Sequence, residues 1–325
     1  MHILVTGAAG MIGRKLTARL VRDGMLNGKA IDRLTLIDVV APEKPRDSSA
    51  AVETTTGDLS APGAAAKAVA GRPDVVFHLA GVVSGEAETD FDKGYRVNLD
   101  GTRALFEAVR SAGIKPKIVF TSSIAVFGAP FPPSIPDEFH LTPLTSYGTQ
   151  KAICELLLAD YTRRSFFDGI GIRLPTICVR PGKPNKAASG FFSGIIREPL
   201  AGQEALLPVS VSVRHTHASP RAAVGFLIHA ASLTRDQLGP QVNLAMPGVS
   251  CTVGEQIEAL RRVAGDKVAA RIRRSPDELV QRIVSGWAER LDATRARNLG
   301  FKAEATFDDI IRAHIEDELG GKIAA

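Results

Sequence analysis

The chain has 325 residues, 45% of them hydrophobic, so it can bury a substantial core in one large domain or two modest ones. Its 40 lysines and arginines exceed its 35 acidic residues by only five and form no long run, which argues against a nucleic-acid-binding protein. We expect no signal peptide and no membrane-spanning segment, and therefore a soluble cytoplasmic protein.

Short β-branched runs alternate with helical patterns over the first half of the chain. Strands are predicted at 2–5, 34–38, 52–56, 74–80 and 117–122, and helices at 12–24, 64–69, 91–112 and 147–167. Apolar strands separated by helices are typical of a parallel sheet that is covered on both faces. The pattern predicts an α/β fold with a Rossmann-type, doubly wound parallel sheet.

The pattern loosens after residue 179, where proline and glycine become dense through 181–208. The further predicted elements are helices at 191–200, 218–231, 252–265 and 306–319 and strands at 171–179, 241–245 and 268–274. We expect residues 1–178 to form the first domain, which 212–247 rejoins. Residues 179–211 and 248–325 are expected to form a smaller, discontinuous substrate-binding lobe.

A glycine-rich loop, VTGAAGMIGR (5–14), joins the first predicted strand to the first helix. Gly7, Gly10 and Gly13 permit a tight turn, let the backbone approach a diphosphate and let the helix pack closely on the strand. The amides at the start of the helix, at Met11 and Ile12, can then bind the phosphates. In this setting the loop predicts a dinucleotide site.

Acidic residues at two strand ends refine the expected cofactor. Asp38 ends the second strand, where a carboxylate holds the adenosine ribose hydroxyls and repels a 2′-phosphate, so NAD is favoured over NADP. Asp58, with Leu59 packed beside it, lies either at the adenine edge or at the N-cap of a helix. Leu79 and Ala80 are expected where the backbone passes close to the cofactor.

The stretch SYGTQK (146–151) carries the expected chemistry. Tyr147 and Lys151 are four residues apart, so they share one face of a helix. A nearby ammonium favours the phenolate form of a tyrosine and so prepares it to act as a base. Ser123, at the end of the strand 117–122, can donate a hydrogen bond to the same substrate oxygen. Together they would remove a hydroxyl proton while a hydride leaves the same carbon.

Four motifs in this order, VTGAAGMIG, HLAG (78–81), TSSIAVFG (121–128) and SYGTQK, resemble the extended short-chain dehydrogenase/reductase family, also called the NAD-dependent epimerase/dehydratase family. The resemblance covers essentially the whole chain. It implies NAD as the cofactor and Ser123, Tyr147 and Lys151 as the catalytic set. It also implies dimerisation through the helices at 91–112 and 147–167, so we expect a homodimer.

The same resemblance implies roles for three further residues. Asn98, in VNLDGT, matches the asparagine that helps to order the active-site helix. Pro175 and Thr176, in LPT (174–176), match the segment that faces the nicotinamide amide. Phe127 stands where many members have a tyrosine, so a hydroxyl found in those members is missing here.

The second lobe is rich in cations, which suits an anionic substrate, either a carboxylate or a diphosphate. About half of them are expected to be ordinary solvated surface charges. The cations are Arg173, Arg180, Lys183, Lys186, Arg197, Arg214 and Arg221.

The segment 174–221 resembles a branch of the family that oxidises a four-carbon sugar acid, D-erythronate, at C2. His215 stands where sugar-nucleotide members carry an acid. On this interpretation a cation in the second lobe holds the substrate carboxylate, and polar side chains bind the hydroxyls. The candidates for these contacts are Ser84, Ser123, Arg180, Lys183, Asn185, Ser189, Arg214 and His215.

Two other classes of function remain open. A sugar-nucleotide epimerase or dehydratase would return the hydride and show no net reduction of NAD. A non-catalytic NAD-sensing module would bind the cofactor without turnover. We expect no metal site, because His215 and His217 lack a third ligand and the three cysteines, Cys154, Cys178 and Cys251, are scattered.

Overall fold

The computed structural model describes residues 1–182 and 189–324, which form two compact units. The first unit contains Met1–Val126, Pro143–Leu174 and Val224–Ala245, and the second contains Phe127–Thr142, Pro175–Ala223 and Met246–Ala325. This division differs from the expected one in four places. The first unit ends at residue 174 rather than 178, its return begins at 224 rather than 212 and ends at 245 rather than 247, and 127–142 belongs to the second unit.

A seven-stranded sheet with the order β12-β8-β7-β6-β1-β4-β5 forms the centre of the first unit, and every pair in it is parallel. The doubly wound parallel sheet predicted from the sequence is therefore confirmed. Its strands are β1 (His2–Thr6), β4 (Arg33–Asp38), β5 (Ala51–Thr56), β6 (Val75–His78), β7 (Lys117–Ser123), β8 (Asp168–Leu174) and β12 (Asn243–Ala245). The short strands β2 (Met25–Leu26) and β3 (Lys29–Ala30) pair with each other.

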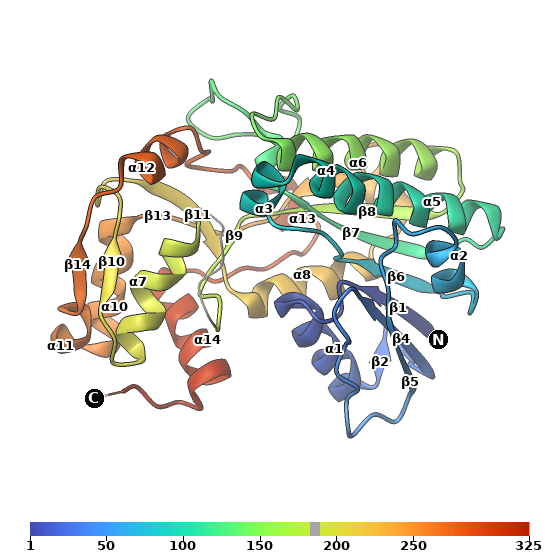
Figure 1. Ribbon diagram of the computed structural model, residues 1–325, viewed down its shortest axis with the longest axis horizontal. Coiled ribbons are helices and arrows are strands. Elements are labelled where there is room, and N and C mark those ends of the chain that lie inside the picture. Colours follow the sequence, from blue (N-terminus) through green and yellow to red (C-terminus); the bar gives the residue numbers. More distant parts are fainter. Residues whose placement is uncertain (183–188, 325) are drawn as a thin grey trace. The chain divides into compact units, whose positions relative to one another are not determined.

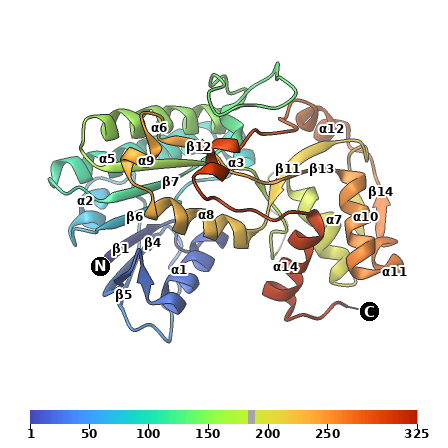
Figure 2. The same ribbon diagram turned by 180° about the vertical axis from the view of Figure 1, so that it is seen from behind.

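Helices cover both faces of this sheet, as its buried apolar strands require. Figure 1 shows α5 (Gly101–Ser111) and α6 (Ser146–Arg163) over one face and α1 (Met11–Asp23) over the other, and Figure 2 shows the same layers from behind. The remaining helical elements of this unit are α2 (Ala64–Val69), α3 (Ser84–Thr89), α4 (Phe91–Gly94), a π-helical turn (Tyr95–Asp100), a 3-10 turn (Ile124–Val126) and α9 (Arg235–Leu238). Helix α8 (Pro220–Ser232) runs from the second unit into the first.

The face that α6 turns toward the sheet is unusually polar. Its buried stripe follows the three- and four-residue spacing of one helix face and consists of Gly148, Lys151, Glu155, Leu158 and Thr162. Only one of these five side chains is a large apolar group. Hydrogen bonds rather than apolar packing alone therefore fix α6 on the sheet.

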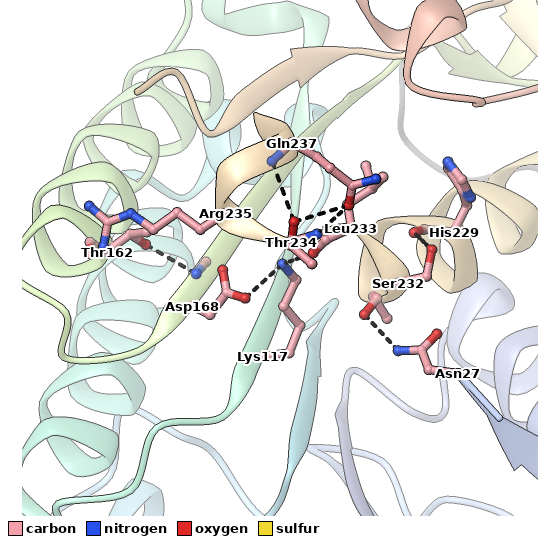
Figure 3. Close-up of polar contacts among 12 residues, drawn as sticks. Asn27, Lys117, Thr162, Asp168, His229, Ser232, Leu233, Thr234, Arg235 and Gln237 are labelled. Carbon is pink, nitrogen blue, oxygen red and sulfur yellow. Dashed lines mark hydrogen bonds and ion pairs between the residues drawn. The ribbon is translucent and has the colours of Figure 1, made fainter. Parts of the chain in front are cut away.

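An ion pair joins the first residues of β7 and β8, at the amino ends of these two strands. The Lys117 Nζ atom lies 3.1 Å from Asp168 Oδ2 and donates a 2.5 Å hydrogen bond to the Leu233 carbonyl (Figure 3). Nearby, Asn27 donates a 2.8 Å hydrogen bond to the Ala231 carbonyl. These bonds attach residues 231–233, which precede β12, to the amino end of β7 and to the turn between β2 and β3.

The second unit is a smaller α/β assembly. Strands β9 (Thr176–Ile177), β11 (Arg214–Ala218) and β13 (Val249–Thr252) form one sheet, and β10 (Ala205–Leu207) pairs with β14 (Ile272–Arg274). Its helices are α7 (Gly190–Leu200), α10 (Val253–Ala264), α11 (Asp266–Ala269), α12 (Glu278–Ser285), α13 (Thr294–Asn298) and α14 (Phe307–Leu319). Their apolar faces pack together around Phe192, Leu260 and Ile310.

Several predicted boundaries differ from the structure for local reasons. The strand predicted at 171–179 is two strands, β8 and β9, because Pro175 has no amide hydrogen with which to continue the ladder. Of the strand predicted at 268–274, the structure contains only β14, because residues 266–269 form α11. The capped start of the helix at 252 is confirmed by a capping box between Thr252 and Glu255. Among the described residues, no helix combines the length and apolar character needed to cross a membrane.

Candidate active site

The loop between β1 and α1 has the close backbone packing that its glycines predicted. Gly7 has a φ of 73°, and a Cβ atom there would lie 2.6 Å from the Ala80 nitrogen. A Cβ atom on Gly13 would lie 2.2 Å from the Gly7 carbonyl oxygen. Neither position has room for a side chain, so the loop lies directly on the backbone that follows β6.

The amino end of α1 is available for an anion. The N-cap residue Gly10 provides no side-chain hydrogen bond to the first turn, which begins at Met11 and Ile12. The first amides of any helix have no partner within the helix, and they carry the positive end of its dipole. This end of the helix is therefore built for phosphate groups, as in dinucleotide sites.

Asp38 lies at the end of β4 beside this loop. Its Oδ2 atom accepts a 2.9 Å hydrogen bond from the Ala9 amide, and its Oδ1 atom accepts one of 3.2 Å from the Val40 amide. The carboxylate thus has a fixed position next to the glycine loop. A bare backbone cradle, a helix amino end and an adjacent carboxylate fit the diphosphate and ribose of a dinucleotide.

Asp58 is not the N-cap of α2, whose N-cap is Gly63. Its Oδ1 atom accepts hydrogen bonds from the Ser60 amide, at 2.9 Å, and from the Ser60 hydroxyl, at 2.7 Å, in a local turn. Helix α2 begins only at Ala64. The adjacent Leu59 is buried in the core of the unit. The N-cap interpretation is therefore wrong, and the adenine-edge interpretation stays a prediction.

Ser123, Tyr147 and Lys151 all belong to the first unit. Ser123 is the last residue of β7, and its Oγ atom accepts a 3.1 Å hydrogen bond from the Ala125 amide. Tyr147 and Lys151 lie one turn apart near the start of α6, with the Lys151 Nζ atom 5.8 Å from the centre of the Tyr147 ring. Lys151 and Tyr147 therefore lie close to each other, as expected.

The ammonium group of Lys151 is buried and held from several sides. It donates a 2.8 Å hydrogen bond to the Thr121 carbonyl and lies 4.8 Å from the centre of the Phe120 ring. Burial, with a smaller contribution from the charge of Lys151, lowers the pKa of His78 to about 3. Both ring nitrogens of His78 are hydrogen-bonded within the core, to Thr6 and Thr102. His78 is therefore a packed strand residue.

Asn98 lies in the π-helical turn and connects two parts of the site. Its Oδ1 atom accepts a 2.8 Å hydrogen bond from the Val82 amide, and its Nδ2 atom donates one of 2.7 Å to Gln150, the residue before Lys151. A Cβ atom on Gly81 would lie 2.8 Å from Asn98 Oδ1 and 3.7 Å from Lys151 Nζ. The π-helical turn thus brings the Asn98 amide to α6, and such turns are frequent at functional sites.

The other predicted contacts are distributed over both units. Ser84 is the first residue of α3 in the first unit, whereas Pro175 and Thr176 belong to the second. Lys183, Asn185 and Lys186 lie outside the described residues. Ser189 accepts a 3.2 Å hydrogen bond from the guanidinium of Arg180, which also donates one of 3.0 Å to the Ile177 carbonyl.

Most of the remaining cations have acidic neighbours. Arg214 lies 3.1 Å from Glu255 and donates to the Ser250 carbonyl. Three other arginines form ion pairs, Arg173 with Glu155, Arg197 with Glu198, and Arg221 with both Glu316 and Asp317.

His215 is buried among aromatic side chains of the second unit. Its Nε2 atom is 2.8 Å from the Thr176 hydroxyl, and its Nδ1 atom is 2.9 Å from the Ala288 carbonyl. Its ring stacks on Phe192, and burial lowers its pKa to about 4. A direct substrate contact would have to replace one of these two hydrogen bonds. Within 1–182 and 189–324, no cluster of three potential metal ligands occurs.

Two buried polar residues of α6 were not predicted from the sequence. Gln150 bonds Asn98, and Glu155 forms an ion pair of 2.8 Å with Arg173. The available signal was spacing, because Glu155 follows Lys151 by four residues on the same helix face. A glutamate on a helix more often faces solvent, so this spacing alone does not indicate a buried glutamate.

Comparison with known proteins agrees with this geometry. The sequence model of the NAD dependent epimerase/dehydratase family matches residues 3–220. The chain is 51% identical over 321 residues to D-erythronate dehydrogenase of Cupriavidus necator, covering 98% of each chain. It is 41% identical over 319 residues to D-erythronate dehydrogenase of Haemophilus influenzae, covering 98% of this chain and 100% of that one.

Solved structures resemble the whole chain. One, described as the nucleoside-diphosphate-sugar epimerase of Agrobacterium tumefaciens, is 68% identical with a TM-score of 0.98 and covers 100% of this chain and 96% of its own. An L-threonine dehydrogenase of Cupriavidus necator has a TM-score of 0.84 at 22% identity, covering 98% of this chain and 99% of its own. At that identity the second likeness concerns the fold alone.

Proposed function

The chain belongs to the NAD dependent epimerase/dehydratase family, and we propose that it oxidises a small sugar acid, D-erythronate, at C2 to the 2-oxo acid with net reduction of NAD. One structural observation carries the chemistry: the buried Lys151 ammonium lies 5.8 Å from the Tyr147 ring in the unit that holds the glycine loop. The names of the two curated relatives support the choice of substrate.

In this proposal the residues of the first unit handle the proton of the C2 hydroxyl. Tyr147 accepts that proton through its phenolate oxygen, and Lys151 stabilises the phenolate. Ser123 donates a hydrogen bond to the same substrate oxygen and keeps it in place. NAD, when bound, supplies the hydride acceptor. The glycine loop, including Gly7, Gly10 and Gly13, and the amino end of α1 at Met11 and Ile12 would hold its diphosphate.

The remaining cofactor contacts of the proposal follow the sequence predictions. Asp38 would hold the adenosine ribose, and its charge would disfavour the 2′-phosphate of NADP. The other assigned cofactor contacts are Asp58, Leu59, Leu79, Ala80, Asn98, Tyr147, Lys151, Pro175 and Thr176.

We assign the substrate carboxylate to a cation of the second unit, with Arg180, Lys183 and Arg214 as the candidates. Arg180 donates to a carbonyl and a hydroxyl, and a carboxylate is a stronger acceptor than either. Ser84, Asn185 and Ser189 are assigned to substrate hydroxyls. His215 has no assigned contact, because both of its ring nitrogens are engaged in the core.

We further propose that the protein is a cytoplasmic homodimer. All three cysteines are free and buried, which is typical of a reducing compartment. Leu156 on α6 is 65% exposed and Phe91 at the start of α4 is 56% exposed, so the helices expected at a dimer interface carry uncovered apolar groups. Light scattering should give the mass of a dimer, and Leu156→Glu should give that of a monomer.

A sugar-nucleotide epimerase is the alternative that a specific observation favours. The solved structure that is 68% identical is described as a nucleoside-diphosphate-sugar epimerase. Such an enzyme grips a diphosphate, for which the family commonly uses a strand near this point of the chain in which an acid and an aromatic residue follow an arginine. The arginine is present here as Arg214. His215 stands in place of the acid and is bonded within the core. This difference argues for the smaller acid.

The test follows NADH absorbance with NAD and, in separate assays, D-erythronate, L-threonate, UDP-sugars and dTDP-sugars. The proposal expects steady NADH formation with D-erythronate and none with the sugar nucleotides. Absence of NADH with both acids, together with an epimerised sugar nucleotide in the product, would overturn it. Turnover of any substrate also excludes a module that only senses NAD.

A further inference from the structure

A buried ionic network lies on the inward face of α6. Glu155, which is fully buried, accepts hydrogen bonds from Arg173 at 3.0 Å and 2.8 Å and from the Ser122 hydroxyl at 2.5 Å. Arg173 is only 6% exposed and Ser122 only 3%. The network therefore connects the helix to two neighbouring strands, β7 and β8, away from solvent.

The position of this network relates it to the proposed chemistry. Glu155 follows Lys151 by one helical turn and Tyr147 by two, on the same helix. Ser122 is directly bonded to Ser123 in β7. A continuous path of covalent and hydrogen bonds therefore connects Ser123, which addresses the substrate oxygen, through Glu155 to Tyr147, which takes the proton.

The free energy of burying the charges of Glu155 and Arg173 indicates that the ion pair fixes the geometry of α6 rather than stabilising the fold. A buried ion pair often contributes no more to stability than apolar residues of the same volume would, because both charges must first lose their water. It does impose directions, since a carboxylate that accepts from a guanidinium fork and a hydroxyl has little freedom to rotate or slide. Apolar packing alone would leave α6 more freedom along its axis.

Several contacts hold α6 on the sheet, including the Lys151 bond to the Thr121 carbonyl of β7, and the side chain of Glu155 reaches both β7 and β8. Near its start, a Cβ atom on Gly148 would lie 2.1 Å from the Ala125 carbonyl oxygen, which fixes the distance between α6 and the turn after β7. Toward its end, Thr162 accepts a 3.1 Å hydrogen bond from the Gly169 amide. Between them, Glu155 is the acidic group that ties the helix to both strands.

We propose that Glu155, through Ser122 and Arg173, is a positioning residue that sets the rotation and axial position of α6 and so places Tyr147 and Lys151 opposite Ser123. The inference rests on the proposed function of those three residues. Glu155 itself touches neither substrate nor cofactor in this account. Its effect on the reaction is carried by the helix.

The test uses two variants, because a change of Glu155 alone would leave Arg173 as an uncompensated buried charge. Ser122→Ala removes a single hydrogen bond, and Glu155→Gln/Arg173→Met removes both charges together. Because small displacements of reacting groups are costly, we expect about a tenfold loss of kcat from the first and about a hundredfold loss from the second. The Kd for NAD should stay within about twofold, because the glycine loop is untouched.

A matched control lies at the other end of the same two strands. The register pairs Ser122 with Arg173 and, five residues earlier, Lys117 with Asp168. At the rise of a strand these positions are roughly 17 Å apart. Asp168→Asn removes the partly buried acid shown in Figure 3 and should lower the melting temperature without changing kcat. This variant therefore measures how the loss of an ion pair between these strands changes the melting temperature and kcat when α6 is not displaced.

A second readout separates positioning from a loss of folded protein. The pH at which kcat/KM is half-maximal should move by about half a unit in the Ser122→Ala variant and not in Asp168→Asn, because only the first changes the surroundings of the base. If Ser122→Ala and the double variant keep the kcat and pH profile of the wild type, as the control does, the positioning role is excluded. Failure of the wild-type protein to reduce NAD with either acid would instead count against the proposed function.

Discussion

Lys151 shows how one residue of this protein is prepared for its role. Its ammonium group is 5% exposed and hydrogen-bonded to the Thr121 carbonyl, with the Phe120 ring beneath it. A buried charge of this kind acts on its neighbours through a medium of low polarity, where its field is strong. The Tyr147 ring, 5.8 Å away, lies within that field.

Tyr147→Phe tests the proton transfer at this residue. Loss of the phenolic oxygen should lower kcat by about two to four powers of ten, while the Kd for NAD changes by less than about threefold. Stopped-flow turnover and fluorescence titration with NAD measure the two quantities. Tyr161→Phe is the control on the same helix, because its hydroxyl bonds Glu107 and burial raises its pKa to about 12. Equal activity of the two variants would contradict the assignment.

Asp38→Ala tests the choice of cofactor. The substitution removes a carboxylate that is fixed beside the glycine loop by the amides of Ala9 and Val40. The Kd for NAD should rise about tenfold or more, because hydrogen bonds to charged groups are worth roughly 1.5–3 kcal/mol. The ratio of kcat/KM for NAD to that for NADP should fall by a similar factor. An unchanged ratio would show that another residue discriminates between the two.

At the scale of elements, the glycine loop and α1 depend on the absence of side chains. Gly13→Ala would place a Cβ atom 2.2 Å from the Gly7 carbonyl, so α1 must move away from β1. We expect a lower melting temperature and about a tenfold weaker affinity for NAD. Gly225→Ala is the matched control, because a Cβ atom there meets nothing within 4 Å in helix α8. A Gly13→Ala protein that bound NAD as tightly as this control would rule out the close-packed loop as the diphosphate site.

The sequence was most informative where one local pattern decides one element. Apolar strands and the loop at 5–14 predicted the parallel sheet and its first helix, because periodicity and glycine geometry act over a few residues. The sequence was least informative where the structure of a segment depends on residues that are distant in the sequence. Strand β13, over Val249–Thr252, exists because it pairs with β11, and the sequence carried no local signal for it. Glu155 is buried only because Arg173 and Ser122 come from other strands.

At the scale of the whole molecule, buried neutral histidines make stability depend on pH. Burial lowers the pKa of His78 to about 3, that of His215 to about 4, and that of His217 well below its usual value. A lowered folded-state pKa means that the unfolded chain binds protons first as the pH falls. Stability is therefore lost as the pH drops from about 6.5 toward these values, by up to about 1.4 kcal/mol per pH unit for each histidine.

Denaturant unfolding at pH 7.5, 6.0 and 5.0 measures this dependence. The free energy of unfolding should fall with pH, and His215→Gln should flatten the fall while lowering stability at every pH. Replacing His140, which is exposed, by Gln should leave the slope unchanged. A His215→Gln protein with the wild-type slope would show that this imidazole does not stay neutral in the folded state.

The cysteines give a second test at this scale. Burial raises the pKa of Cys154 to about 11 and those of Cys178 and Cys251 to about 12. A buried thiol that is not ionised reacts slowly, so an aromatic disulfide reagent at pH 8 should modify none of the three in the folded protein. All three should react after unfolding. Rapid modification of the native protein would mean that one of these cores opens readily.

In the proposed reaction a hydride leaves C2 of the sugar acid for NAD and stays on the cofactor. D-erythronate carrying deuterium at C2 tests it directly, with mass spectrometry of the cofactor after turnover. We expect one deuterium in each NADH formed and a slower initial rate than with the protonated acid. Reduced cofactor without deuterium, or deuterium returned to a sugar product with no net NADH, would contradict it.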